Sequence, residues 1–272
     1  MVPVLTTVFC VITLLVSLIL PILALVVYAL RHKKQGIWSA WGLGALGFVI
    51  PQMCIRSPIL NLLQKQNWFA LFAQNHLLAY TFFLALTAGL FELAGRFASA
   101  QLMRRNLTAA RGLAAGMGHG GIEAMAFIGT AYINNLVFIT LLNSGGLDAL
   151  VSQTAAAGGD PAPLLYYRDT LCNTASILFL LAGLERLLTM ICHAAMSMLV
   201  CYGVARKKAL PCALVCLAIH TCLDMAAGIP LLAGSAMSQA TAYCIVYLIL
   251  ILVAATAVYM IRDLRRRWNP AP

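Results

Sequence analysis

Acidic, imidazole and guanidinium side chains lie inside long apolar stretches of this chain, where they could do chemistry that lipid-facing residues cannot. An ionisable group at the centre of a bilayer costs about 2.5–3.5 kcal/mol on insertion scales, so each one is a functional candidate. Six of the seven form pairs four residues apart, which places the members of each pair on one helix face. The seven residues are Glu92, Arg96, His119, Glu123, His193, His220 and Asp224.

Imidazoles and carboxylates that converge from several helices can hold a divalent cation, and zinc fits this donor set first. A zinc ion lowers the pKa of the water bound to it, and a nearby carboxylate can accept the proton that this water loses. These two groups together could catalyse hydrolysis. The chain has no HExxH motif, which excludes a soluble zincin. A proton or cation path and a hydrogen-bonded packing network are alternative interpretations of the same residues.

The chemical residues share a common depth. Glu92, Glu123, His193 and His220 each lie 12 or 13 residues from a basic residue that marks the end of their stretch. At 1.5 Å per residue, this places all four about 18–20 Å from the basic edge. We therefore predict that four helices bring them to one level.

Composition indicates that lipid surrounds most of the chain. Of the 272 residues, 62% are apolar and only 10% are charged, too few charges to cover a water-facing surface. The 18 basic residues outnumber the 8 acidic ones, but they form short clusters between apolar stretches, as the positive-inside rule requires. The predicted partner is therefore the lipid bilayer and not nucleic acid. The nine cysteines are expected to pack as small apolar residues rather than to form disulfides.

The elements that position these residues are predicted to be membrane-spanning helices. We expect an all-α, polytopic transmembrane bundle that forms a single integral membrane domain over 1–272, with a four-helix core. The basic clusters place the N-terminus outside and the C-terminus in the cytoplasm. The loop at 143–170 is rich in turn residues, and 165–180 is expected to contain an interfacial helix. Spans are predicted near 4–30, 37–62, 70–100, 112–142, 178–204, 209–231 and 238–261.

Two further features bear on packing and charge. The fourth predicted span opens with closely spaced glycines, which let helix backbones approach one another around an internal site. Arg56 lies beside Pro58 in the second span, and its role is open between a snorkelling and a pore-lining residue. The glycines are Gly112, Gly116, Gly118, Gly120 and Gly121.

The order of the motifs resembles the YhfC family of membrane peptidases. That family is similar to the wider group of CAAX-protease and bacteriocin-processing enzymes and to the PrsW proteases. The resemblance covers the core helices within 88–230. It is carried by Glu92-Leu-Ala-Gly-Arg96, Gly118-His119-Gly-Gly-Ile-Glu123, Glu185-Arg186, His193-Ala-Ala-Met-Ser197 and His220-Thr-Cys-Leu-Asp224.

The resemblance implies an intramembrane metalloprotease of a bacterial-type plasma membrane. It would be a zinc-dependent endopeptidase that hydrolyses peptide bonds of membrane-associated peptides or proteins. His193, His220 and His119 would bind the metal. Asp224 would either bind the metal as well or orient one of its ligands. The wider group has a second glutamate where this chain has Phe91.

The roles of the remaining motif residues follow from that departure. The candidate base is Glu123, with Glu92 second, and Arg96 would pair with Glu92. A proton or cation transporter and a non-catalytic scaffold or immunity protein are the alternative functions.

Overall fold

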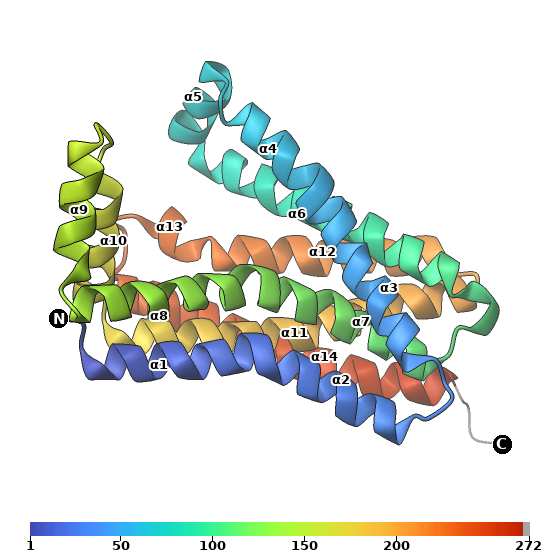
Figure 1. The fold of residues 1–272 in the computed structure, drawn as a ribbon. Helices are drawn as coiled ribbons and strands as arrows, with labels where there is room; N and C mark the ends of the chain where they lie inside the picture. The colour runs from blue at the N-terminus through green and yellow to red at the C-terminus, as the bar shows by residue number, and fades with distance from the viewer. Residues whose placement is uncertain (269–272) are drawn as a thin grey trace. The chain divides into compact units, whose positions relative to one another are not determined.

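The computed structural model describes residues 1–268, which form helices and connecting turns and contain no strand (Figure 1). Seven helical stretches in this part of the chain are long and apolar enough to cross a membrane, which confirms the predicted number of spans. They are Val4–Arg31, Ile37–Leu63, Leu77–Leu102, Ala109–Asn143, Ser176–Ala205, Ala209–Ala227 and Gln239–Trp268.

Some predicted boundaries were wrong because local breaks interrupt apolar sequence. The third span starts at Leu77 rather than near 70, since His76 leaves helical geometry with φ −133° and ψ 52° and separates it from the preceding short helix. The sixth span ends at Ala227 rather than near 231. The predicted helix at 165–180 is instead α10, Ala162–Asn173, and the next span begins at Ser176.

The chain divides into two compact units, each of which we describe by itself. A single membrane domain over 1–272 stays a prediction. The first unit comprises Met1–Ile22 and Ala124–Leu187. In its core the Thr13 hydroxyl and the Tyr132 hydroxyl both donate to the Phe179 carbonyl, at 2.6 and 3.0 Å. Its elements are α1 (Val4–Leu14), η1 (Leu15–Ile19), η4 (Met125–Gly129), α8 (Thr130–Asn143), α9 (Gly146–Ala156) and α10, with the adjoining parts of α2 and α11.

The second unit comprises Leu23–Glu123 and the described residues from Leu188 onward. Here α3, the wide-turn π-helical segment η2 and α4 follow one another as one rod alongside α6 (Figure 1). Its elements are α2 (Leu20–Arg31), α3 (Ile37–Phe48), η2 (Val49–Arg56), α4 (Ser57–Leu63), α5 (Asn67–Asn75), α6 (Leu77–Leu102), η3 (Arg104–Asn106), α7 (Ala109–Ala124), α11 (Ser176–Ala205), α12 (Ala209–Ala227), α13 (Ile229–Ala233) and α14 (Gln239–Trp268).

Glycines bring the backbones of the second unit into direct contact. A methyl group on Gly95 of α6 would lie 1.7 Å from the Gly47 carbonyl oxygen of α3, and one on Gly118 of α7 would lie 2.0 Å from the Trp41 carbonyl oxygen. A methyl group on Gly116 would lie 2.6 Å from Ala194 Cα of α11. No side chain fits at these positions, so the glycine-rich sequence produces the close packing that we expected.

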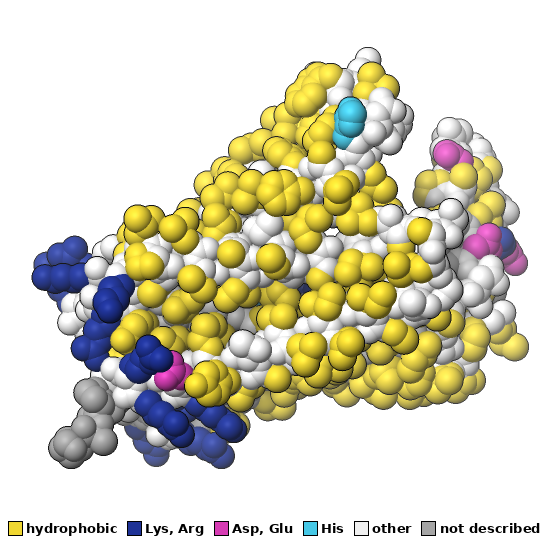
Figure 2. All heavy atoms as spheres, turned by 180° about the vertical axis from the view of Figure 1, so that it is seen from behind, with side chains coloured by type: hydrophobic (Ala, Val, Ile, Leu, Met, Phe, Trp, Pro, Cys, Tyr) yellow, Lys and Arg dark blue, Asp and Glu magenta, His cyan; other side chains and the backbone are white. Residues whose placement is uncertain are grey.

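The basic clusters gather at one end of the second unit (Figure 2). Arg265 Nη2 donates to the Tyr28 hydroxyl at 3.2 Å, and Arg206 Nη2 donates to the Arg267 carbonyl at 2.8 Å. Four clusters that are far apart in sequence thus meet at one edge, as the loop assignment requires.

Candidate metal centre

One carboxylate oxygen lies at the centre of the cluster of chemical residues. Helix α6 buries Glu92 to 3% exposure, and Glu92 Oε2 accepts hydrogen bonds from Arg96 Nη2 at 3.0 Å and His119 Nε2 at 2.9 Å. His193 Nδ1 is 3.7 Å and His220 Nδ1 is 3.6 Å from the same oxygen. Four nitrogens from four helices therefore surround a single acidic atom.

Helices α7 and α11 supply two of the three imidazoles because glycine leaves room between them. A methyl group on Gly120 would lie 2.8 Å from His193 Cβ, so a larger residue there would push the helices apart. The His119 and His193 rings stack with centroids 5.5 Å apart, and the Phe48 ring meets His119 edge-on at 5.3 Å. Phe48 and the stacked neighbour thus fix the orientation of His119.

The hydrogen bonds of His193 define its tautomer. Arg96 Nη2 lies 2.6 Å from His193 Nδ1, and a guanidinium can only donate, so Nδ1 accepts. The proton of the neutral ring is then on Nε2, which lies 2.9 Å from Glu123 Oε2. His193 thereby connects the buried Glu92–Arg96 pair to a second carboxylate.

Helix α12 adds His220 and Asp224 on one face. His220 Nε2 lies 3.3 Å from Asp224 Oδ2. A methyl group on Gly89 of α6 would lie 3.4 Å from His220 Cδ2, so the glycine admits this ring beside Glu92. The Asp224 side chain is 40% exposed and that of Glu123 is 14% exposed, against 5% for Glu92. Asp224 and Glu123 are therefore the more exposed carboxylates of the cluster, and Glu92 is the most buried.

The donor set fits a zinc ion. Glu92, His119 and His193 each offer a ligand atom, and these atoms all lie within 4.8 Å of one another. In the described part of the chain, His119 Nδ1 and His220 Nδ1 are buried without a hydrogen-bond partner, which is unusual for ring nitrogens unless an ion or water completes the site. A carboxylate and imidazoles are ordinary zinc ligands.

The structure brings all seven sequence-predicted site residues into this one network. Glu92, Glu123, His193 and His220, whose spacing predicted a common depth, lie together in it. The expected pairing of Arg96 with Glu92 is present. Glu92 is more central than expected, because it contacts three helices beyond its own rather than Arg96 alone. Glu185 and Arg186 of the resemblance pair with each other in the first unit.

Sequence reasoning left open the role of one ionisable residue of the same unit. Arg56 of η2 is 8% exposed, and its Nη2 donates to the Leu84 carbonyl of α6 at 2.7 Å. Asp224 and Glu92 act on its charge through space. The sequence indicated a special role for Arg56 because an arginine is unusual inside an apolar span. Its spacing from other residues did not reveal which helix it faces.

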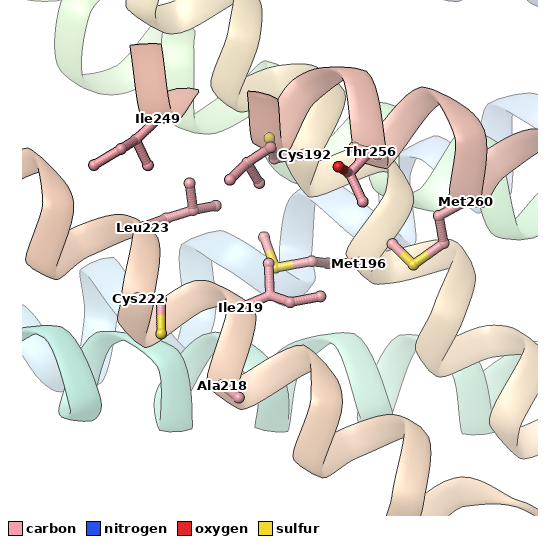
Figure 3. Close-up of a pocket in the computed structure, with 11 residues that line it drawn as sticks. Cys192, Met196, Ala218, Ile219, Cys222, Leu223, Ile249, Thr256 and Met260 are labelled. Atoms are coloured by element: carbon pink, nitrogen blue, oxygen red, sulfur yellow. The ribbon is translucent and has the colours of Figure 1, made fainter. Parts of the chain in front are cut away.

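An apolar hollow lies between α11, α12 and α14 of the second unit, with a volume of about 350 Å³ (Figure 3). Cys192 and Leu223, neighbours in sequence of His193 and Asp224, belong to its lining. None of its described lining residues is charged, so these residues offer no acid–base group there. Its other lining residues include Met196, Ile219, Val253 and Met260.

Comparison with known proteins identifies relatives over most of the chain. The family model described as YhfC intramembrane metalloprotease matches residues 16–253. The uncharacterized membrane protein YhfC of Bacillus subtilis (strain 168) is 29% identical over 252 residues, which cover 92% of this chain and 93% of that protein. No solved structure matches.

Proposed function

Since the chain belongs to the YhfC intramembrane metalloprotease family, we propose that it is a zinc-dependent endopeptidase that hydrolyses peptide bonds of membrane-associated peptides or proteins. The observation that carries this proposal is the gathering of three imidazoles around Glu92 Oε2 inside membrane-spanning helices. Burying so many polar groups in apolar helices is costly, and a catalytic metal site accounts for that cost.

Glu92, His119 and His193 are the candidate metal ligands, and His220, whose Nδ1 is 3.6 Å from Glu92 Oε2, is the candidate to replace one of them. Three protein ligands with an open position are typical of catalytic zinc, whereas four closed ones are typical of structural zinc. When bound, zinc would polarise a peptide carbonyl and make water acidic. Asp224, beside His220 Nε2, orients that ring in the way that carboxylates orient metal-binding histidines.

Glu123 is the candidate general base. Its side chain is more exposed than that of Glu92, and its contact with His193 holds it beside the cluster. Glu92 is itself a candidate metal ligand, so its lone pairs would be engaged by the metal. The Glu123 carboxylate would accept the proton of the attacking water and return it to the leaving amine.

The basic end of the second unit supports an orientation for the protein. Positively charged loops remain on the cytoplasmic side, so we place the C-terminus in the cytoplasm and the N-terminus outside a bacterial-type plasma membrane. In this orientation Asp224 lies on the outer side of Glu92, because α12 starts at the basic end with Ala209. The substrate would then approach the cluster from the outer half of the membrane.

Metal content and cleavage test the proposal together. Purified wild-type protein is expected to hold about one zinc per chain, and His119→Ala and His193→Ala to lose it, as measured by elemental analysis. Glu123→Gln should keep the zinc and lose chelator-sensitive cleavage of membrane peptides. Arg105→Met, at an exposed position, is the control.

Other results would favour the alternative functions. Folded wild-type protein without zinc and without chelator-sensitive cleavage would contradict the peptidase. Liposome ion flux that is lost in His193→Ala and His220→Ala would indicate a transporter instead. Partner binding that survives all these substitutions would indicate a scaffold.

A further inference from the structure

Arg56 is a buried cation without a close anionic partner. No carboxylate of the described residues lies within 4.0 Å of its guanidinium, although the residue is 92% buried in a membrane-spanning stretch. Both of its hydrogen bonds are made to α6: Nε donates to Thr87 Oγ1 at 3.2 Å and Nη2 to the Leu84 carbonyl at 2.7 Å. Such a charge is expensive at this position. Asp224 and Glu92 offset it only from beyond that distance, and a carboxylate in direct contact would offset it further.

The two bonds use one edge of the guanidinium. Nε and Nη2 lie on that edge. Among the described residues Nη1 makes no hydrogen bond, so the edge formed by Nη1 and Nη2 keeps unpaired N–H groups. Two parallel N–H groups at this edge match the two oxygens of a carboxylate. Thr87 and Leu84 therefore hold the group in a fixed orientation with its bidentate edge available.

The register of the helices places Arg56 just outward of the metal centre. A methyl group on Gly89 would lie 3.3 Å from Thr221 Oγ1, and one on Gly228 would lie 2.8 Å from Thr81 Cγ2, so α6 and α12 run antiparallel and Asp224 is level with Ala85. Thr87 precedes Glu92 by five residues, or about 7.5 Å along α6. This is the length of about two residues of extended peptide.

Two more buried polar atoms lie on the helices between these points. Gln52 of η2 is 7% exposed and Thr221 of α12 is 8% exposed. In the described part of the chain, Gln52 Oε1 and Thr221 Oγ1 have no hydrogen-bond partner. An amide oxygen that needs a donor and a hydroxyl that needs an acceptor suit the N–H and C=O groups of a peptide, whereas a lipid acyl chain offers neither.

We propose that Arg56 binds a carboxylate of the substrate peptide, about two residues from the bond that is cleaved. The carboxylate is either the C-terminus of the peptide or an aspartate or glutamate side chain. This subsite deepens the proposed function and rests on it, because it assigns the substrate that the peptidase would take. Arg56 acts in binding, and Gln52 and Thr221 extend the contact along the peptide backbone.

The test measures binding to protein freed of metal by chelation, so that no cleavage is needed. The probes are N-acetylated hexamers of leucine and alanine in two pairs: free C-terminus against C-terminal amide, and internal glutamate against glutamine in an amidated peptide. Wild-type protein in nanodiscs is expected to bind the carboxylate member of at least one pair about 10- to 100-fold more tightly. The pair that responds identifies the source of the carboxylate.

Variants then assign the preference to Arg56. Arg56→Gln should bind both members of the responding pair with equal affinity. Arg56→Lys should keep part of the preference, because an ammonium group retains the positive charge but lacks the two parallel N–H groups of a guanidinium. Thr87→Val, which removes one of the two orienting bonds, should weaken the preference several-fold even if Arg56→Gln does not fold. The matched control is Lys65→Gln, which removes an exposed charge from the end of the same rod.

Three results would overturn the subsite: no preference in either pair for wild-type protein, an unchanged preference in folded Arg56→Gln, or displacement of the peptides by phosphatidylglycerol in the nanodisc. The last result would assign Arg56 to a lipid phosphate. If the protein prefers the carboxylate peptides but shows no chelator-sensitive cleavage, the proposed peptidase activity would be rejected and the carboxylate-binding subsite would be retained. If the protein cleaves peptides but shows no such preference, the peptidase activity would be retained and the subsite would be rejected.

Discussion

Replacement of Arg96 should make the protein bind zinc more tightly. Glu92 Oε2 and His193 Nδ1 are 3.7 Å apart, and Arg96 Nη2 lies 3.0 Å from the first and 2.6 Å from the second. A zinc ion bonded to both atoms at about 2.0–2.1 Å would lie no farther than about 3 Å from Nη2. Two positive charges would then share one site in a poorly screened interior, so the guanidinium has to withdraw when the metal binds.

The size of the effect follows from the bonds that Arg96 must give up. It makes two hydrogen bonds that involve a charged donor, each worth about 1.5–3 kcal/mol. The lower limit of about 3 kcal/mol corresponds to a dissociation constant for zinc about 100-fold smaller in Arg96→Met. The Glu92 carboxylate, left with His119 but without its guanidinium partner, acts in the same direction, because a buried charge that has lost its counter-ion favours an incoming cation.

Competition with a chromophoric zinc chelator measures this affinity in detergent. Arg96→Gln is a second variant in case Arg96→Met does not fold, and Arg105→Met controls for the loss of one positive charge at an exposed position. Size-exclusion chromatography and circular dichroism report folding. If folded Arg96→Met or Arg96→Gln bound zinc no more tightly than the wild type, the guanidinium would not occupy the metal position and the reasoning would fail.

Two other predictions concern packing and orientation. Gly95→Ala should cost about 1–3 kcal/mol of stability and lower the thermal unfolding temperature, because its methyl group would meet the Gly47 carbonyl oxygen at 1.7 Å. Gly42→Ala is the control, because its methyl group would meet nothing within 4 Å. Equal unfolding temperatures for the two variants would contradict this packing. Asp224→Asn should weaken zinc binding about 10-fold, as loss of an orienting carboxylate does, in the same titration. A loss as complete as that of His193→Ala would instead make Asp224 a ligand.

The number of spans and the common depth of the chemical residues could be predicted from sequence. Length and hydropathy suffice for the spans, and the distances of Glu92 and His220 from their basic clusters suffice for depth. The start of the third span was predicted wrongly because apolar residues such as Phe69, Leu71 and Phe72 also precede His76. Only the backbone angles of His76 separate the two helices.

The arrangement of residues around Glu92 could not be predicted. Spacing of i,i+4 tells which residues share a face, but it does not tell which neighbouring helix that face meets. Glu92 was expected to pair with Arg96, and it does, yet its contacts with His119, His193 and His220 depend on close approaches at Gly89 and Gly120. The orientation of Arg56 depends on the π-helical hydrogen bonding of η2, which could not be predicted from a sequence pattern.

The glycine contacts also decide which part of the second unit can move. Helices α3, α6, α7 and α11 touch through main-chain atoms, at Gly47 with Gly95, Gly118 with Trp41, and Gly116 with Ala194, so none of them can rotate or slide without a collision of backbones. At Gly89, in contrast, α12 meets α6 through the side chains of Leu217, His220 and Thr221, which have rotamers to spare. Side-chain rotamers can therefore absorb small adjustments at this contact, so the positions of His220 and Asp224 relative to Glu92 are less rigidly fixed than those of His119 and His193.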